Sequence, residues 1–238
     1  MDDDTRPQKT SKKPAGNSPE SAAHYVGGSA CTAPTHDESY SERQTRNIRE
    51  QAALRHWAEQ HGLLSGFIPK NRFDGGEHSV DYDQRKDRFI KATLESIGFG
   101  YGTYLSSSGQ QATAGEYLDR LALHNRIFHD DIRIECVVPR GASGMLSVVT
   151  SQQRISGEPA AVDQIDETML AYGFEPFGDG IYFNSHESLL IHDMHPRNAV
   201  FSQGRAVPID TSIQRVTPAF AAWVRANKQI LRNQGMLR

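Results

Sequence analysis

The chain has 238 residues, of which 37% are hydrophobic and 23% charged, and its formal net charge is −3 at pH 7. This length allows one large domain or two small lobes around a shared cleft, while the nearly balanced charge gives no basic field for binding nucleic acid. Cys31 lies in a polar stretch and Cys136 on an expected strand, so neither a disulfide framework nor a zinc knuckle is indicated.

Residues 1–40 form a polar head with an acidic start, scattered lysines and many Pro, Gly, Ser and Thr residues. A segment of this composition cannot bury enough apolar surface to offset the entropy lost on ordering. We therefore predict that the head is disordered and dispensable for folding. Ser41 is expected to cap the helix that follows, which carries apolar residues from Ile48 to Ala58 and ends near Gly62.

A short meander of strands is expected next. It has a turn at Gly75 and Gly76 after its first strand, a second strand through Val80 and Tyr82, and a third strand over 89–92. The pattern then changes to that of a helix over 110–128, with leucines and a tyrosine on one stripe. Two further strands, 133–138 and 145–150, complete an order of three strands, one helix and two strands.

The second half of the chain is predicted to be compact. A helix begins at Val162 and ends near Gly173, and short strands follow at residues 174–177, 181–183 and 189–191. Thr217 and Pro218 are a cap and a first residue typical of helices, so a last helix is expected from there to about Gly235.

One stretch, Leu190-Ile-His-Asp-Met-His-Pro-Arg-Asn-Ala-Val200, carries most of the chemical information. An apolar run delivers Asp193, Asn198 follows five residues later, and a second apolar strand beginning at Val207 delivers Asp210. Phosphoryl transfer needs one carboxylate to orient the attacking hydroxyl, and an amide oxygen with a second carboxylate to hold Mg²⁺ against the nucleotide. Pro196 stiffens the loop between the first two residues.

This stretch resembles the catalytic loop of the protein-kinase-like superfamily, in the variant common among aminoglycoside and small-molecule kinases. It is closest to the serine/threonine/tyrosine-kinase domain of bacterial polyvalent proteins of mobile elements. The resemblance implies that Asp193 is the catalytic Asp and that Asn198 and Asp210 bind the metal. Thr211-Ser212 replaces the Phe-Gly expected after the metal-binding Asp, so regulation by a flipping Phe is not expected.

The implied fold is α+β, namely a bilobal protein-kinase-like fold with a small antiparallel-sheet N-lobe. Only 28 residues follow Asp210, so the C-lobe is expected to be minimal. The expected division is a disordered head over 1–40, an N-terminal helix plus N-lobe over 41–150, and a C-lobe over 151–238.

Lys91 is the candidate for the lysine that holds the nucleotide phosphates. It lies mid-strand, faces opposite to Ile90 and Ala92, and resembles the lysine of the kinase Val-Ala-Ile-Lys strand. Glu116, on the helix that follows, is expected to pair with it, and Asp119 is the alternative partner.

Other contributions to a nucleotide site are expected from three places. Backbone amides of the Gly75-Gly76 turn can approach phosphate, although a plain hairpin turn explains the two glycines equally well. Val80 is expected to line the adenine pocket, and Ser151, in Thr150-Ser-Gln152, to offer backbone groups to the base. His195 is expected to face the transferred phosphate, with a charge that depends on pH.

The function expected from these features is an ATP- and Mg²⁺-dependent kinase that phosphorylates a hydroxyl of a protein or small molecule. One alternative is a pseudokinase, or nucleotide-binding interaction module, that keeps the fold but not turnover. A less favoured alternative is a metal-dependent hydrolase with His192, Asp193, His195 and Asp210 as ligands. The sequence shows no secretory signal and no long apolar run, so we expect a cytoplasmic protein without a membrane partner; export by another route stays open.

Overall fold

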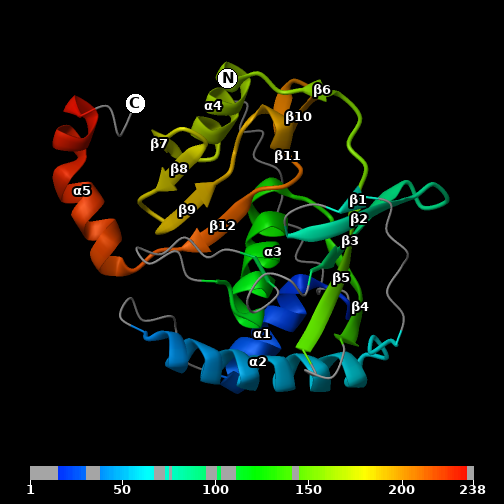
Figure 1. The fold of residues 1–238 in the computed structure, drawn as a ribbon. Helices are drawn as coiled ribbons and strands as arrows, with labels where there is room; N and C mark the ends of the chain where they lie inside the picture. The colour runs from blue at the N-terminus through cyan, green and yellow to red at the C-terminus, as the bar shows by residue number, and fades with distance from the viewer. Residues whose placement is uncertain are drawn as a thin grey trace, which may run out of the picture.

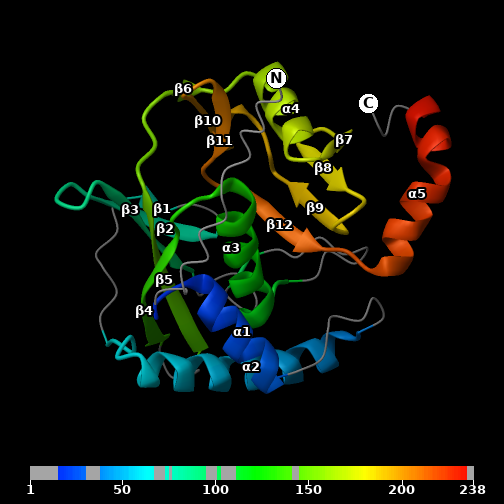
Figure 2. The same ribbon diagram turned by 180° about the vertical axis from the view of Figure 1, so that it is seen from behind.

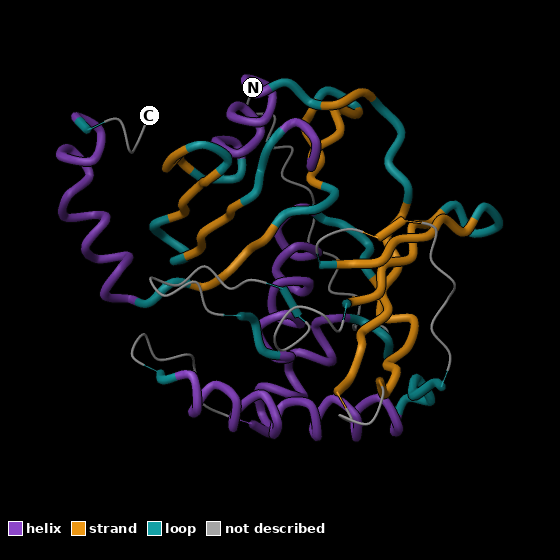
Figure 3. Tube along the Cα trace, viewed as in Figure 1, coloured by secondary structure: helices purple, strands orange, loops and turns teal. Residues whose placement is uncertain are grey.

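The computed structural model describes residues 16–30, 38–66, 73–74, 77–94, 101–102, 111–140 and 145–234. Within them the fold is α+β and the sheets are antiparallel (Figures 1 and 3). The helices are α1 (Pro19–Ala30), α2 (Tyr40–Gln60), α3 (Ala114–Phe128), α4 (Val162–Ala171) and α5 (Pro218–Asn233), with a short 3₁₀ turn, η1 (Pro196–Asn198).

Three antiparallel sheets contain the described strands. The first half of the chain supplies β1 (Phe73–Asp74), β2 (His78–Asp83), β3 (Arg88–Thr93), β4 (Arg133–Arg140) and β5 (Met145–Gln153). The second half supplies β6 (Glu158–Pro159), β7 (Glu175–Gly178), β8 (Ile181–Asn184), β9 (Leu189–His192), β10 (Ala199–Ser202), β11 (Arg205–Pro208) and β12 (Ser212–Arg215).

The first half forms a five-stranded sheet in the order β1-β2-β3-β5-β4, with α3 inserted between β3 and β4 in the sequence. The predicted order of three strands, one helix and two strands is therefore confirmed. The helix over 110–128 begins later than expected, because Thr113 is its N-cap and forms a capping box with Glu116. The predicted turn at Gly75 and Gly76 lies outside the described residues.

Helix α2 lies along the end of this sheet, with α1 beside it (Figures 1 and 2). Its N-cap is Ser39 rather than the predicted Ser41, since Ser39 forms a capping box with Glu42. Leu54 and Trp57 of α2 are buried in a core that also takes in residues of α1 and α3.

The prediction of a wholly disordered head is wrong for α1. Ala22 and Val26 are fully buried against α2 and α3, and the carbonyl of Asn17 accepts a hydrogen bond from the amide of Ile134 on β4 at 2.9 Å. Small residues on one face let α1 approach its neighbours closely, so a helix with few large apolar side chains still gains enough burial to order.

Val26→Ala is expected to lower the free energy of unfolding by about 1 to 3 kcal/mol, because it removes two buried methyl groups from a packed core. The measurement is chemical denaturation of the full chain. His24 lies on the exposed side of the same helix, so His24→Ala serves as the matched control and should change stability by less than about 0.5 kcal/mol. Equal, small effects at both positions would mean that α1 contributes nothing to the core.

The second half contains a four-stranded sheet in the order β12-β9-β8-β7 and a three-stranded sheet in the order β11-β10-β6. The predicted helices α4 and α5 are present, and Thr217 caps α5 with Pro218 as its first residue. The β10–β11 hairpin closes through Gln203 and Gly204, which have φ angles of 50° and 79°. Positive φ angles at both turn residues are typical of the tight two-residue turns that join antiparallel strands.

Helix α3 stands between the two halves and contacts both (Figure 1). Its residues Leu118 and Leu121 belong to the core with α1, α2 and the five-stranded sheet. Leu123 and Phe128 belong instead to the core of the second half. In the described part of the chain, none of the helices is both long and apolar enough to cross a membrane.

Candidate functional site

A cleft lies where α3, the five-stranded sheet and the segment before β12 meet. Its lining comes from β2, β3, β5 and α3, and from Ile209, Asp210 and Thr211. The empty space, including the part open to solvent, is about 400 Å³.

The loop between β9 and β10 carries Asp193 and Asn198. Asp193 has a φ of 62°, a left-handed conformation that Asp tolerates better than most residues, and its side chain is 60% exposed. The Asn198 side-chain amide donates to the Asp193 carbonyl at 2.8 Å and to its carboxylate at 2.9 Å. Because both partners are acceptors, the amide nitrogen faces Asp193 and the amide oxygen points away from it.

His195 is held inside the same loop. Its Nδ1 accepts a hydrogen bond from the backbone N–H of Arg197 at 3.2 Å, and its Nε2 lies 3.0 Å from the Asp193 carboxylate. A neutral imidazole that accepts at Nδ1 carries its proton on Nε2. His195 therefore donates towards Asp193, and its expected contact with a transferred phosphate stays a prediction.

Asp210 is linked to this loop through the backbone. The N–H of Ile209 donates to the carbonyl of Asn198 at 2.8 Å, which fixes the segment beside the loop. Lys91 reaches the same segment from β3: its Nζ donates to the Ile209 carbonyl at 2.7 Å and lies 3.6 Å from the Asp210 carboxylate. The structure thus brings Lys91, Asn198 and Asp210 to neighbouring positions, as the sequence predicts.

The charge on Asp210 is set by its surroundings. Partial burial alone would raise the pKa of the Asp210 carboxyl, but the cations of Lys91 and Arg120 lower it below its usual value. The carboxylate is therefore ionised over the whole neutral range, which is the form that can bind a cation.

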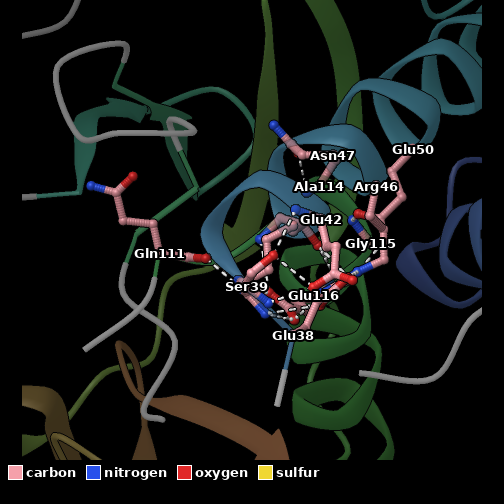
Figure 4. A network of polar contacts seen from close by, with 12 residues as sticks. Glu38, Ser39, Glu42, Arg46, Asn47, Glu50, Gln111, Ala114, Gly115 and Glu116 are labelled. Carbon is pink, nitrogen blue, oxygen red and sulfur yellow. Dashed lines mark hydrogen bonds and ion pairs between the residues drawn. The ribbon is translucent and has the colours of Figure 1, made fainter. Parts of the chain in front are cut away.

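The predicted pairing of Lys91 with Glu116 is wrong. In the described part of the chain, the Glu116 carboxylate instead binds Arg43 at 2.5 and 2.9 Å and Arg46 at 2.8 Å, within a buried network between α2 and the start of α3 (Figure 4). It also accepts the Thr113 amide at 2.8 Å as part of the capping box. Glu116 thus anchors the first turn of α3 to α2 and is not among the residues that line the cleft.

The alternative partner is also wrong. Asp119 pairs with Arg215 of β12 at 3.0 Å, on the exposed side of α3. The charged residue of α3 that does line the cleft is Arg120, which sequence reasoning missed. The signal was present: Tyr117, Arg120 and His124 share one helical face, at the spacing of neighbouring turns.

The structure places Val80 and Ser151 differently with respect to the cleft. Val80 lies opposite Lys91 in the β2–β3 register, so the two side chains share the face of the sheet that bears the cleft. Ser151 lies inside β5 between β3 and β4, and its hydroxyl is bonded to Arg88 and Glu135 on the opposite face. The Ser151 carbonyl accepts a hydrogen bond from the Arg88 guanidinium at 3.1 Å, and the expected backbone contact with a nucleotide base stays a prediction.

His78 is the most perturbed titratable group of the cleft. Burial, followed by the positive charges of Arg120 and Lys91, lowers the pKa of the His78 imidazole to about 3, although Asp210 acts in the opposite direction. Its Nε2 lies 3.0 Å from the Tyr117 hydroxyl. His78 is therefore neutral at physiological pH.

Stability is expected to fall as the pH is lowered below about 6.5, because the unfolded chain then binds a proton on His78 that the folded chain does not. The effect of His78 between pH 7 and pH 5 is roughly 2 kcal/mol. Urea denaturation at the two pH values measures it, and His78→Gln should reduce the difference. An unchanged pH dependence in this variant would mean that His78 is already solvated in the folded state.

The ligand set of the alternative hydrolase is not assembled. Among the described residues, no group of three or more His, Cys, Asp and Glu side chains is arranged to hold a metal ion. All four residues proposed for that site, His192, Asp193, His195 and Asp210, are described. Burial, followed by the nearby Arg120, lowers the pKa of His192, and its Nε2 has no hydrogen-bond partner in the described part of the chain.

The profile of one protein family matches residues 47–217 of the chain. That family is described as the Serine/Threonine/Tyrosine Kinase found in polyvalent proteins. The chain belongs to this kinase family. No curated protein and no solved structure matches the chain at a significant level of similarity.

The part that matches the kinase family contains the whole candidate site. It begins inside α2, at Asn47, and ends at Thr217, the N-cap of α5. Helix α3, the cleft, the Asp193 loop and Asp210 all lie within it, whereas α1 and the anchoring Arg43 and Arg46 lie before it. The resemblance inferred from the catalytic-loop residues is thereby confirmed at the level of the family.

Proposed function

We propose that this kinase-family chain is an ATP- and Mg²⁺-dependent phosphotransferase that transfers the γ-phosphoryl group to a hydroxyl of a protein or small molecule. The observation that carries the proposal is the meeting of three segments. The loop with Asp193 and Asn198 is hydrogen-bonded to the segment with Asp210, and Lys91 binds that segment from the sheet. Family membership supports the same reaction class.

The arrangement of elements supports a bilobal interpretation of the fold. The five-stranded sheet with α3 corresponds to the expected N-lobe, and the second-half sheets with α4 and α5 to the expected C-lobe. Strand β5 runs to Gln153, beyond the expected division after residue 150, so on this interpretation we take residues 154–157 as the connection between the lobes.

The residues present fit Mg²⁺. This ion prefers hard oxygen ligands, which the ionised Asp210 and the outward-facing amide oxygen of Asn198 supply. Bound Mg²⁺ would neutralise charge on the nucleotide phosphates. The backbone link between Ile209 and Asn198 keeps the two ligand segments beside each other.

Asp193 is the residue that acts on the acceptor. Its exposed carboxylate can receive the proton of an acceptor hydroxyl as the new oxygen–phosphorus bond forms and the bond to the departing ADP breaks. The contacts from Asn198 and His195 fix its orientation, so little reorganisation is needed at the moment of transfer. Because Asp193 is open to solvent, either a small molecule or a protein side chain can reach it.

Lys91→Ala is expected to lower kcat/KM by about a hundredfold or more, because a cation that contacts developing phosphoryl charge contributes several kcal/mol. Steady-state kinetics with ATP and Mg²⁺ measures the loss, and the melting temperature shows whether the variant is folded. Lys86, which is 57% exposed in the turn between β2 and β3, provides the control variant Lys86→Ala. If both variants keep normal activity, Lys91 does not hold the phosphates.

The experiment that tests the proposed function is incubation of the full chain with ATP and Mg²⁺, followed by mass spectrometry of the protein and of candidate hydroxyl acceptors. A gain of one phosphoryl group that depends on Asp193 supports the kinase. Glu116 binds Arg43 instead of Lys91, which favours a second candidate, a nucleotide-binding module without turnover. Nucleotide binding by calorimetry without any transfer would support that candidate and reject the first.

A further inference from the structure

Arg120 connects three parts of the cleft that are distant in sequence. From α3, its guanidinium donates to the Ser212 hydroxyl of β12 at 3.0 Å and to the Glu77 carboxylate, which directly precedes β2, at 3.2 and 3.3 Å. It also lies over the ring of Tyr117, with 4.9 Å between the guanidinium carbon and the ring centroid. The side chain is only 11% exposed, so these contacts are shielded from solvent.

The segment over 209–212 is consequently held from two sides. Lys91, on β3, binds the carbonyl of Ile209 and approaches the carboxylate of Asp210. Arg120, on α3, binds the side chain of Ser212, two residues further on and only 7% exposed. Asp210 therefore lies between two fixed points, one on the sheet and the other on the helix.

Glu77, the acidic partner of Arg120, is held by close packing against a glycine. It packs against Gly102, where a Cβ atom would lie 2.4 Å from the carboxylate carbon of Glu77. Gly102 also has a φ of +80°, a conformation that glycine adopts without strain. Arg120 further acts on the cleft as a charge, since it lowers the pKa of both His192 and Asp210.

We propose that Arg120 is a positioning residue that fixes Asp210 for metal binding by holding Ser212 against α3. This inference rests on the proposed function, in which Asp210 is a ligand of Mg²⁺. Residues that orient metal ligands typically change metal affinity by about 10- to 100-fold when they are replaced. Because Glu116 anchors α3 to α2, the position of Asp210 depends in turn on the contact between these two helices.

The test compares Arg120→Gln and Ser212→Ala with the wild-type chain. Calorimetry with a non-hydrolysable ATP analogue, over a series of Mg²⁺ concentrations, gives the Mg²⁺ concentration needed for half-maximal binding. We expect Arg120→Gln to raise it by about 10-fold or more. Ser212→Ala should raise it in the same direction, because it removes the group through which Arg120 acts. Unchanged Mg²⁺ dependence in Ser212→Ala overturns the proposal, and this variant decides the outcome if Arg120→Gln does not fold.

A matched control is Arg215→Gln. Arg215 also links β12 to α3, through Asp119, but on the exposed side and away from the cleft. Its loss should leave the Mg²⁺ dependence within about twofold of the wild type. An equal effect of both arginine variants would mean that any β12–α3 link suffices, which contradicts a specific role of Arg120.

Amide hydrogen exchange over 209–212 keeps this inference separate from the proposed function. Without any nucleotide, Arg120→Gln and Ser212→Ala should exchange faster in this segment than the wild type, while Arg215→Gln should not. If the wild-type chain binds no Mg²⁺–nucleotide at all, the proposed function fails, and with it the metal-binding role of Asp210. If wild-type binding is normal but exchange and Mg²⁺ dependence are unaffected in the variants, only the role of Arg120 is rejected.

Discussion

Asp193→Asn is expected to lower the rate of phosphoryl transfer by about 10²- to 10⁴-fold and to leave nucleotide affinity nearly unchanged. The substitution keeps the size of the side chain but removes the carboxylate that takes the acceptor proton. It also brings an amide into contact with the donor groups of Asn198 and His195, so the orientation of the side chain is disturbed as well. Single-turnover kinetics together with calorimetric binding of the ATP analogue separates the two effects.

Asp163→Asn is the control for this experiment. Asp163 is an exposed carboxylate in the first turn of α4, so its neutralisation should alter neither transfer nor binding. Wild-type turnover in Asp193→Asn would remove the loop from the mechanism. Loss of nucleotide binding in that variant would instead point to Asp193 as a ligand of the metal.

Glu116→Gln is expected to reduce the free energy of unfolding by about 3 to 5 kcal/mol, the largest stability effect that we predict. Glu116 is the acceptor shared by Arg43 and Arg46 at the contact between α2 and α3, and all three side chains are at most 6% exposed. Removing the carboxylate leaves two buried guanidinium groups with fewer negative partners. Guanidinium chloride denaturation, monitored by circular dichroism, measures the loss.

Asp119→Asn is the matched comparison, since Asp119 lies on the same helix and also pairs with an arginine. That pair is exposed, with side-chain exposures of 56% for Arg215 and 37% for Asp119, so its loss should cost less than about 1 kcal/mol. The comparison also tests the expected pairing of Glu116 with Lys91. If Glu116 acted through Lys91, Glu116→Gln would reduce transfer strongly with little change in stability.

Local signals predicted much of the secondary structure. A cap followed by proline marks α5, and alternating side chains mark β2 and β3. Helix α1 was missed because its burial depends on small residues that contribute little to a hydrophobicity pattern, and on neighbours that lie far along the chain. The short strands β6 and β12 are stabilised by pairing with distant segments, which a sequence window does not contain.

The candidate site, too, could be predicted from the sequence only in part. Asp193 and Asn198 are close in sequence, so their spacing predicts a shared loop, and the link between Asn198 and Ile209 follows from a short hairpin. Which side of α3 faces the cleft is decided by a tertiary contact instead. Arg43 and Arg46 on α2 bind Glu116 and keep it from Lys91, so that Arg120, one turn further on, is the charged residue of α3 in the cleft lining. Nothing near Glu116 in the sequence indicates these partners.

The packing of α3 determines which parts of this chain can be exchanged. Its first turns complete one core and its last turns complete the other, through Leu118 on one side and Leu123 and Phe128 on the other. A fragment that ends at Gln153 would expose Leu123 and Phe128 to water, and the remaining fragment would lack the side chains that close its interior. Neither half is thus expected to fold alone, and a chimera that takes its second half from a related kinase must also adapt the last turns of α3.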